Sequence, residues 1–299
     1  TQQNHFSIPT YKNVGILCDY YWPSIGGVEH FVEDLATRLK ALGINVTIIC
    51  RKLHNRTELI HNGFQIYEID ADKCSTHNFP ALVVEELIAH LRINAIDRMI
   101  AISQPDNWVG NIIADLPPDA AKIIYLPSIS AYNLIQWAMS SDYHRVIRSL
   151  NRADSIVAVS ENGYDSIFLT SNKFPFSIIP HCVDLIDTNH QFRQEHGIDE
   201  SVFLLVMVAN FWPVKNHKEL IHVIENHNNN WLLYIIGNVI EEEKEYYAYV
   251  RKLVDNNPRI KIIPGLSREA TASAIKEADL LLVPSIAESA GPLVVLQAM

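Results

Sequence analysis

The sequence predicts a two-domain α/β protein in which helices flank parallel sheets. Short apolar runs alternate with helical patterns along all 299 residues, as they do in successive βαβ units. The apolar pattern lapses over residues 184–200, longer than a usual connection, and the same alternation then restarts. We therefore expect one Rossmann-like domain over residues 1–184 and another over residues 185–299, with a ligand cleft between them.

The first domain begins with a clearly patterned βαβ unit. Residues 14–18 (VGILC) form the apolar run of a buried strand, and residues 28–42 then carry apolar side chains at helical spacing until Gly43. Residues 45–50 return as the next strand. Further strands are expected at residues 64–69, 98–102, 122–126 and 155–159, with a helix beginning near Ser160.

The second domain repeats this alternation after the polar stretch, which we interpret as the linker. Its strands are expected at residues 202–208, 231–236, 260–263 and 280–283. Its helices are expected from about Asn216, over residues 242–254, and over residues 268–278 behind a Ser267 cap. A last helix opens after Gly291 and ends with the chain at Met299, so we expect this domain to be incomplete.

Composition and charge favour a cytoplasmic protein without a nucleic-acid partner. Apolar residues make up 48% of the chain and charged residues 19%, and no apolar run approaches the roughly twenty residues of a spanning helix. Residues 1–12 lack a secretory signal pattern. A net charge of −10 disfavours nucleic acid. The four cysteines and thirteen histidines show no metal or disulfide spacing, so we expect neither metal nor cofactor.

Two loops that follow strands could approach an anion. Gly26 and Gly27 (PSIGGVE) let the backbone come close to a ligand at a helix N-terminus, although a tight turn alone explains a bare Gly-Gly pair better. Asn210 and Lys215 (ANFWPVKNHK) follow the first strand of the second domain, where a phosphate could meet the lysine and a helix start. A solvated lysine fits the composition at least as well.

Acidic residues follow two other strands. Glu288 precedes Gly291 and the last helix, where its carboxylate could accept hydrogen bonds from sugar hydroxyls; an exposed surface glutamate is the alternative. Asp70 and Asp72 superficially match a DxD metal-binding pair. Two acids at the end of a strand are usually a solvated turn, and other ligands at metal spacing are missing, so we give this pair low weight.

Several of these motifs recur in one known family. The segments that carry the match are PSIGGVEHFVEDLA (23–36), ADSIVAVSENGYDSI (153–167), IIPHCVDL (178–185), NFWPVKNHKELI (210–221) and ADLLLVPSIAESAGPLVVLQAM (278–299). In their order and spacing they resemble the GT-B retaining glycosyltransferases of family four over essentially the whole chain. The resemblance implies two Rossmann-like domains facing a cleft, with the nucleotide sugar mainly on the C-terminal domain and the acceptor mainly on the N-terminal one.

The resemblance also implies roles for matching positions. Lys215 matches the lysine that contacts the donor diphosphate, and Glu288 matches the first glutamate of the family's paired-glutamate motif, which holds the donor sugar. Gly26 and Gly27 match the glycine loop that faces the diphosphate. The other donor-binding positions that it implies are Asn210, Leu266, Ser289, Ala290, Gly291, Pro292, Leu293 and Gln297.

The sequence departs from the family pattern at several of these positions. Asn210 stands where the family usually has an arginine, so one of two expected positive charges is absent. Leu296 stands at the second glutamate, and Gln297 would bind the ribose only with one inserted residue. The histidine that the family often carries near the donor sugar is not evident. The loops in question carry Ser103, Gln104 and Asp106, or Ser128 and Ser130, instead.

The sequence thus predicts an enzyme that moves a hexose from a nucleoside diphosphate sugar, expected to be UDP-linked, to a saccharide or lipid-linked acceptor. Retention at the anomeric carbon and independence from metal follow from the resemblance. A non-catalytic nucleotide-sugar-binding protein of the same fold and a GT-B sugar-nucleotide epimerase stay open as alternatives. Family members often dock on anionic lipid, which leaves peripheral contact with the inner membrane face open.

Overall fold

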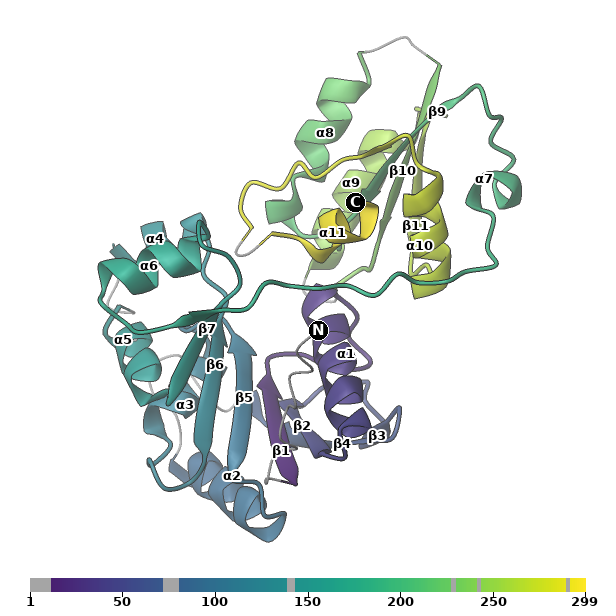
Figure 1. Cartoon of the computed structure of the whole chain (residues 1–299). Coiled ribbons are helices and arrows are strands. Elements are labelled where there is room, and N and C mark those ends of the chain that lie inside the picture. Colours follow the sequence, from purple (N-terminus) through teal and green to yellow (C-terminus); the bar gives the residue numbers. More distant parts are fainter. Residues whose placement is uncertain (1–11, 72–80, 139–142, 227–229, 241–242, 289–290) are drawn as a thin grey trace, which may run out of the picture. The chain divides into compact units, whose positions relative to one another are not determined.

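The computed structural model describes residues 12–71, 81–138, 143–226, 230–240, 243–288 and 291–299. The chain forms two compact units, Thr1–Pro180 and His181–Met299 (Figure 1). The sequence predicts this boundary after residue 184, close to the division after Pro180. No helix in the described ranges has the length and apolar character needed to cross a membrane.

The first unit is built on an eight-stranded sheet in the order β3-β4-β2-β1-β5-β6-β7-β8. Neighbouring strands run parallel, except for the antiparallel pair β3 and β4. The strands are β1 (Asn13–Cys18), β2 (Asn45–Arg51), β3 (Ile60–His61), β4 (Phe64–Ile69), β5 (Arg98–Ser103), β6 (Lys122–Pro127), β7 (Ser155–Ala158) and β8 (Ser177–Ile178).

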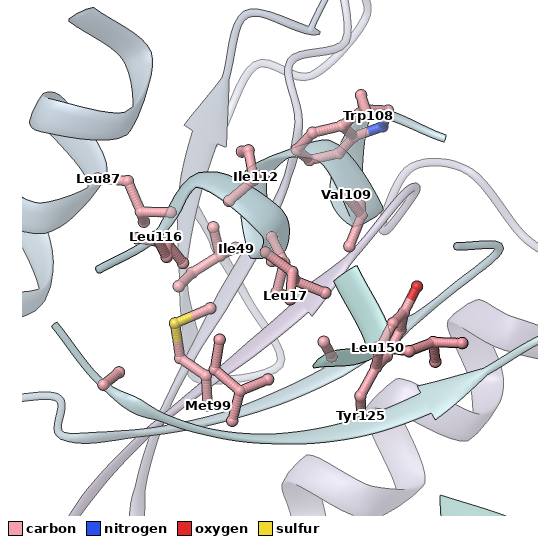
Figure 2. Close-up of a cluster of buried hydrophobic side chains, with 14 of the residues drawn as sticks. Leu17, Ile49, Leu87, Met99, Trp108, Val109, Ile112, Leu116, Tyr125 and Leu150 are labelled. Carbon is pink, nitrogen blue, oxygen red and sulfur yellow. The ribbon is translucent and has the colours of Figure 1, made fainter. Parts of the chain in front are cut away.

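Helices cover both faces of this sheet because the central strands are apolar on both sides. Ile16 and Ile48 pack on the face that α1 covers, while Leu17 and Ile49 pack on the opposite face, beneath α2 and α3. Figure 2 shows the second cluster, where Ile112 of α3 lies among side chains of the sheet. The helices are α1 (Gly27–Ala41), α2 (Ala81–Ile93), α3 (Trp108–Asp115), α4 (Ala131–Ala138), α5 (Tyr143–Arg152) and α6 (Tyr164–Ser171).

The second unit has a four-stranded parallel sheet in the order β11-β10-β9-β12. Helices α8 and α9 pack on one face and α7 and α10 on the other. The strands are β9 (Phe203–Val208), β10 (Trp231–Gly237), β11 (Ile260–Pro264) and β12 (Leu280–Leu281). The helices are α7 (Phe192–Glu195), α8 (His217–Ile224), α9 (Lys244–Val254), α10 (Arg268–Glu277) and α11 (Leu293–Ala298), with a 3-10 turn η2 at Pro213–Lys215.

The polar stretch at residues 184–200 is more than the linker we expected. It contains α7, whose Phe192 is 1% exposed and packs edge-on against Tyr234, with 5.0 Å between ring centroids. Arg193 Nη2 bonds Asp279 at 2.7 Å. A four-residue helix is too short to show a period in the sequence, so the stretch looked featureless.

Two element boundaries also differ from the prediction. The helix expected near Ser160 begins at Tyr164, after a turn in which Val159 N–H donates to the Asp165 carboxylate at 3.2 Å. The strand expected at residues 280–283 is limited to Leu280–Leu281, the two residues that pair with β9. The other predicted strands are confirmed to within one residue at each end.

Candidate functional site

In the second unit, the loops after β9 and β12 bring together the two candidate catalytic residues. Lys215 ends the turn η2, and Glu288 lies in the loop between β12 and α11. Lys215 Nζ donates to Glu288 Oε1 at 2.5 Å. The two side chains are 24% and 26% exposed, so solvent screens the pair only in part. A cation and a carboxylate therefore meet at the carboxyl edge of this parallel sheet, where α/β folds bind ligands.

Backbone and amide contacts hold these two loops together independently of the ion pair. Ile286 N–H donates to Val214 O at 2.9 Å. Asn216 Nδ2 donates to Pro284 O at 3.2 Å. Asn216 has a left-handed backbone with φ of 61°, a conformation that asparagine tolerates better than most residues. This residue both ends η2 and precedes α8, so its conformation sets the direction of the Lys215 turn.

The first residue of α8 is a histidine that does not add charge to the site. His217 is fully buried, stacked on Phe211 with 4.9 Å between ring centroids and met edge-on by Tyr246. Burial, helped by the nearby Lys215 charge, lowers the pKa of His217 to about 4. The imidazole is therefore neutral at physiological pH.

Asn210 lies at the same edge but bonds within the protein. Its Oδ1 accepts a hydrogen bond from Asn238 N–H at 3.1 Å, which joins the ends of β9 and β10. The two strands approach closely here, since a Cβ at Gly237 would lie 1.9 Å from Ala209 O. Asn210 thus lies in the loop that carries Lys215 without supplying a positive charge.

The remaining donor-binding candidates of the second unit lie in loops after strands or in the last helix. Leu266 follows β11, and Ser267 caps α10 as predicted, its Oγ accepting from Ala270 N–H at 3.1 Å. Gly291 has a φ of +84°, which glycine adopts without strain. Pro292 is the N-cap of α11, which includes Leu293 and Gln297. Ser289 and Ala290 lie outside the described residues.

In the first unit, Gly26 and Gly27 stand at the start of α1, after the loop that follows β1. Gly26 is extended, with φ of −168°, so its conformation does not itself require glycine. Ser24 Oγ donates to Glu29 Oε1 at 3.1 Å across this loop. Burial raises the pKa of the Glu29 carboxyl. Side chains of the loop and of the first turn of α1 therefore hold this loop in place.

Arg56, which belongs to no motif in the sequence, holds the same loop in place. Its side chain is fully buried. It donates to the carbonyls of Trp22 at 2.6 Å and Tyr21 at 3.0 Å, and to that of Arg51 at 2.9 Å. It also pairs with Glu68 at 2.6 Å. An arginine between two strands gives no sequence signal for such a role.

Polar side chains in the loops where the family carries a histidine are also bonded internally. Ser103 Oγ lies 3.2 Å from the Tyr125 hydroxyl, and both groups are buried. Trp137 Nε1 donates to Asp106 Oδ2 at 2.7 Å. Among the described residues, no group of three or more histidine, cysteine or acidic side chains could hold a metal. Asp70 is described, whereas Asp72 lies outside the described residues.

Solved structures that match this chain include glycosyltransferases and related enzymes. Sucrose-phosphate synthase from Thermosynechococcus elongatus matches 96% of this chain and 78% of its own, at 14% identity and a TM-score of 0.76. HepE of Anabaena, solved with UDP and glucose, matches the same shares at 15% identity and a TM-score of 0.72. These likenesses show the GT-B fold, with its two Rossmann-like domains.

Family models identify the class more closely. The model described as Glycosyltransferase Family 4 matches residues 25–186, and the model described as Glycosyl transferases group 1 matches residues 188–299. The chain belongs to glycosyltransferase family 4. It is also 36% identical over 59 residues to the GPI3 subunit of phosphatidylinositol N-acetylglucosaminyltransferase from Saccharomyces cerevisiae. That segment is 19% of this chain and spans only 13% of the yeast protein.

Proposed function

We propose that this glycosyltransferase moves a hexose from a nucleoside diphosphate sugar to a saccharide or lipid-linked acceptor. UDP is the nucleotide that we expect the donor to carry. The contact between Lys215 and Glu288 at the carboxyl edge of the second sheet carries the proposal. A related structure was solved with UDP and glucose, and a curated relative is named for N-acetylglucosamine transfer. Both names agree with a nucleotide sugar as donor.

The two side chains suit the two ends of such a donor. The ammonium of Lys215 offsets the negative charge that develops on the diphosphate as the bond from the anomeric carbon to the phosphate oxygen breaks. The carboxylate of Glu288 accepts hydrogen bonds from sugar hydroxyls and so orients the ring. We propose that the acceptor hydroxyl attacks from the same face and gives its proton to the leaving phosphate. This gives retention without a protein nucleophile or a metal.

A ligand screen followed by a transfer assay tests this function. UDP, ADP, GDP and their glucose conjugates are added to the protein, since a ligand that binds the folded state raises its unfolding midpoint. We expect one nucleotide and its sugar to raise the midpoint, and labelled sugar to reach a saccharide or lipid acceptor with an α-linked product from an α-linked donor. No midpoint shift at millimolar concentrations would contradict donor binding, and an inverted product would contradict retention.

A second candidate is a protein that binds the nucleotide sugar without transferring it. Asn210 motivates this candidate, because the position is uncharged and its amide oxygen bonds Asn238. Lys215 is then the one charged residue of its loop that is proposed to neutralise the leaving group. Tight nucleotide binding with no hydrolysis and no transfer across a panel of acceptors would favour this candidate. Conversion of the sugar without any acceptor would instead favour an epimerase.

Contact with a membrane surface is a further proposal, and α5 is its candidate element. This helix carries Arg145, Arg148 and Arg152. However, Arg148 pairs with Asp115 at 2.6 Å, and Arg152 Nε donates to Leu116 O at 2.6 Å. Much of its basic charge is thus engaged within the first unit. Co-sedimentation with phosphatidylglycerol vesicles, compared with phosphatidylcholine vesicles, tests this proposal.

A further inference from the structure

We infer that Glu288 competes with the donor diphosphate for Lys215, so that the site favours an intact nucleotide sugar over the free nucleoside diphosphate. The inference rests on the proposed function, because it assumes a nucleotide sugar as donor. It assigns Glu288 a role in discrimination between substrate and product, in addition to holding the sugar. The 2.5 Å contact between Lys215 Nζ and Glu288 Oε1 is the starting observation.

A diphosphate that approaches this site meets an ammonium group already bonded to a carboxylate. The lysine and glutamate side chains are about three-quarters buried, so their attraction exceeds that of a fully exposed pair. The carboxylate also repels the incoming phosphates. To bind a diphosphate, the site must move Lys215 away from Glu288 or share it between two anions, and either change costs free energy.

Within residues 210–219, all of which the structure describes, Lys218 carries the positive charge besides that of Lys215. His217 directly follows the turn and is held neutral by burial. Asn210 is uncharged and bonds Asn238. Lys218 Nζ lies 3.7 Å from Glu219 Oε1, and both side chains are exposed. Among residues 210–219, diphosphate binding therefore draws mainly on Lys215 and on backbone amides.

An attached sugar changes the balance because it brings donors for the carboxylate. Hydroxyl groups of the sugar donate to Glu288 and replace the ammonium that the diphosphate has taken. A free nucleoside diphosphate has no such groups at this position and leaves Glu288 without its cation. The substrate thus gives both Lys215 and Glu288 a new bonding partner, whereas the product gives one only to Lys215. This difference favours release of the product after transfer.

Calorimetric titration of the Glu288→Gln variant with free nucleoside diphosphate tests the inference. The nucleotide is the one of UDP, ADP and GDP that binds the wild-type protein most tightly. We expect the variant to bind it about fivefold more tightly than wild type, which corresponds to about 1 kcal/mol for a partly screened pair. The preference for the sugar conjugate over the free diphosphate should fall by at least the same factor.

Glu219→Gln is the matched control, since it removes one negative charge from the same helix start but is paired with Lys218. It should leave diphosphate affinity within twofold of wild type. Glu288→Asp keeps the charge on a shorter side chain and should not bind diphosphate more tightly, even if the glutamine variant is destabilised. Unchanged or weaker diphosphate binding by folded Glu288→Gln would overturn the inference and leave the proposed function intact. A wild-type protein that binds none of the three nucleotides would overturn both.

Discussion

Polar side chains follow the carboxyl ends of parallel strands in both units, but they are bonded differently. In the first unit, the Arg56 guanidinium is fully buried and binds three carbonyls and a carboxylate. In the second unit, Lys215 and Glu288 stand on separate loops, a quarter exposed, and bond each other. Bonds to fixed carbonyls stabilise a loop, whereas a partly exposed ion pair can exchange its partners for a ligand.

This contrast indicates different roles for the carboxyl edges of the two sheets. Glu29, Ser103 and Asp106 of the first unit all have partners within it, so their polarity shapes the loops. Lys215 and Glu288 bond each other, and we propose that they exchange this bond for contacts with a donor. Stability measurements should therefore respond most to the first unit, and nucleotide binding most to the second.

The largest expected effect on stability is that of Arg56→Met. The variant removes the guanidinium that pairs with the Glu68 carboxylate and donates to the carbonyls of Tyr21 and Trp22. Breaking a buried ion pair in this way costs about 3–5 kcal/mol. Urea denaturation measures the loss, with Arg92→Met on the exposed surface of α2 as control. A loss below about 1 kcal/mol would show that the loop is held by other contacts.

The next effect is a dependence of stability on pH that arises from His217. Its pKa is about 4 in the folded chain against an ordinary value of 6.5, so the unfolded chain binds more protons between these values. The contribution of neutral His217 to the free energy of unfolding is then fully present above pH 6.5. It is lost as the pH drops toward 4, by up to about 3 kcal/mol. His217→Phe should remove most of this slope in urea titrations at several pH values, whereas His222→Phe should retain it. An unchanged slope in His217→Phe would contradict the assignment.

The sequence predicts the apolar framework well because its pattern is local. Residues 64–69 form the predicted strand, since the apolar run and its polar flanks lie in one short window. The four-residue α7 was missed, because it has only one turn, and Phe192 is buried by contacts with residues distant in sequence. The same limit applies to element ends such as Tyr164, which a carboxylate contact six residues apart helps to fix.

The sequence predicts which residues belong to the candidate site, but it does not predict how their side chains are arranged. Lys215 and Glu288 are 73 residues apart, and no periodicity indicates that their side chains touch. Asn216 was missed as a link to Pro284, although an asparagine after a Pro-x-Lys turn is a signal for a left-handed residue. Arg56 was missed because its partners are carbonyls, which the sequence does not display.

A smaller effect is expected from Asn216, whose side chain both stabilises the fold through a hydrogen bond and positions the Lys215 turn. Asn216→Asp keeps the left-handed backbone but turns an amide donor into an acceptor that faces Pro284 O. Asn230→Asp makes the same change at a 3.2 Å bond to Ser201 O, beside the opposite ends of the strands. Each variant should cost about 1 kcal/mol of unfolding free energy. Only Asn216→Asp should also weaken nucleotide binding, by about tenfold in calorimetry; equal binding by both would contradict a positioning role.

The smallest expected effect on stability is that of Lys215→Met. The ion pair with Glu288 is partly screened, and the methionine keeps most of the buried stem, so the unfolding free energy should change by less than about 1 kcal/mol. Thermal denaturation measures this change. A loss as large as that of Arg56→Met would show that the pair is structural and would remove the contrast between the two units.

The role of Lys215 in donor binding is tested by calorimetric titration of nucleoside diphosphate sugar into wild type, Lys215→Met and Lys218→Met. Lys218 is the matched control, because it lies three residues further along and pairs with Glu219. We predict that Lys215→Met weakens donor binding at least tenfold, as expected when a charge-assisted contact to a diphosphate is lost, while Lys218→Met changes it less than twofold. Equal donor affinity in wild type and Lys215→Met would contradict a role for Lys215 in binding the diphosphate.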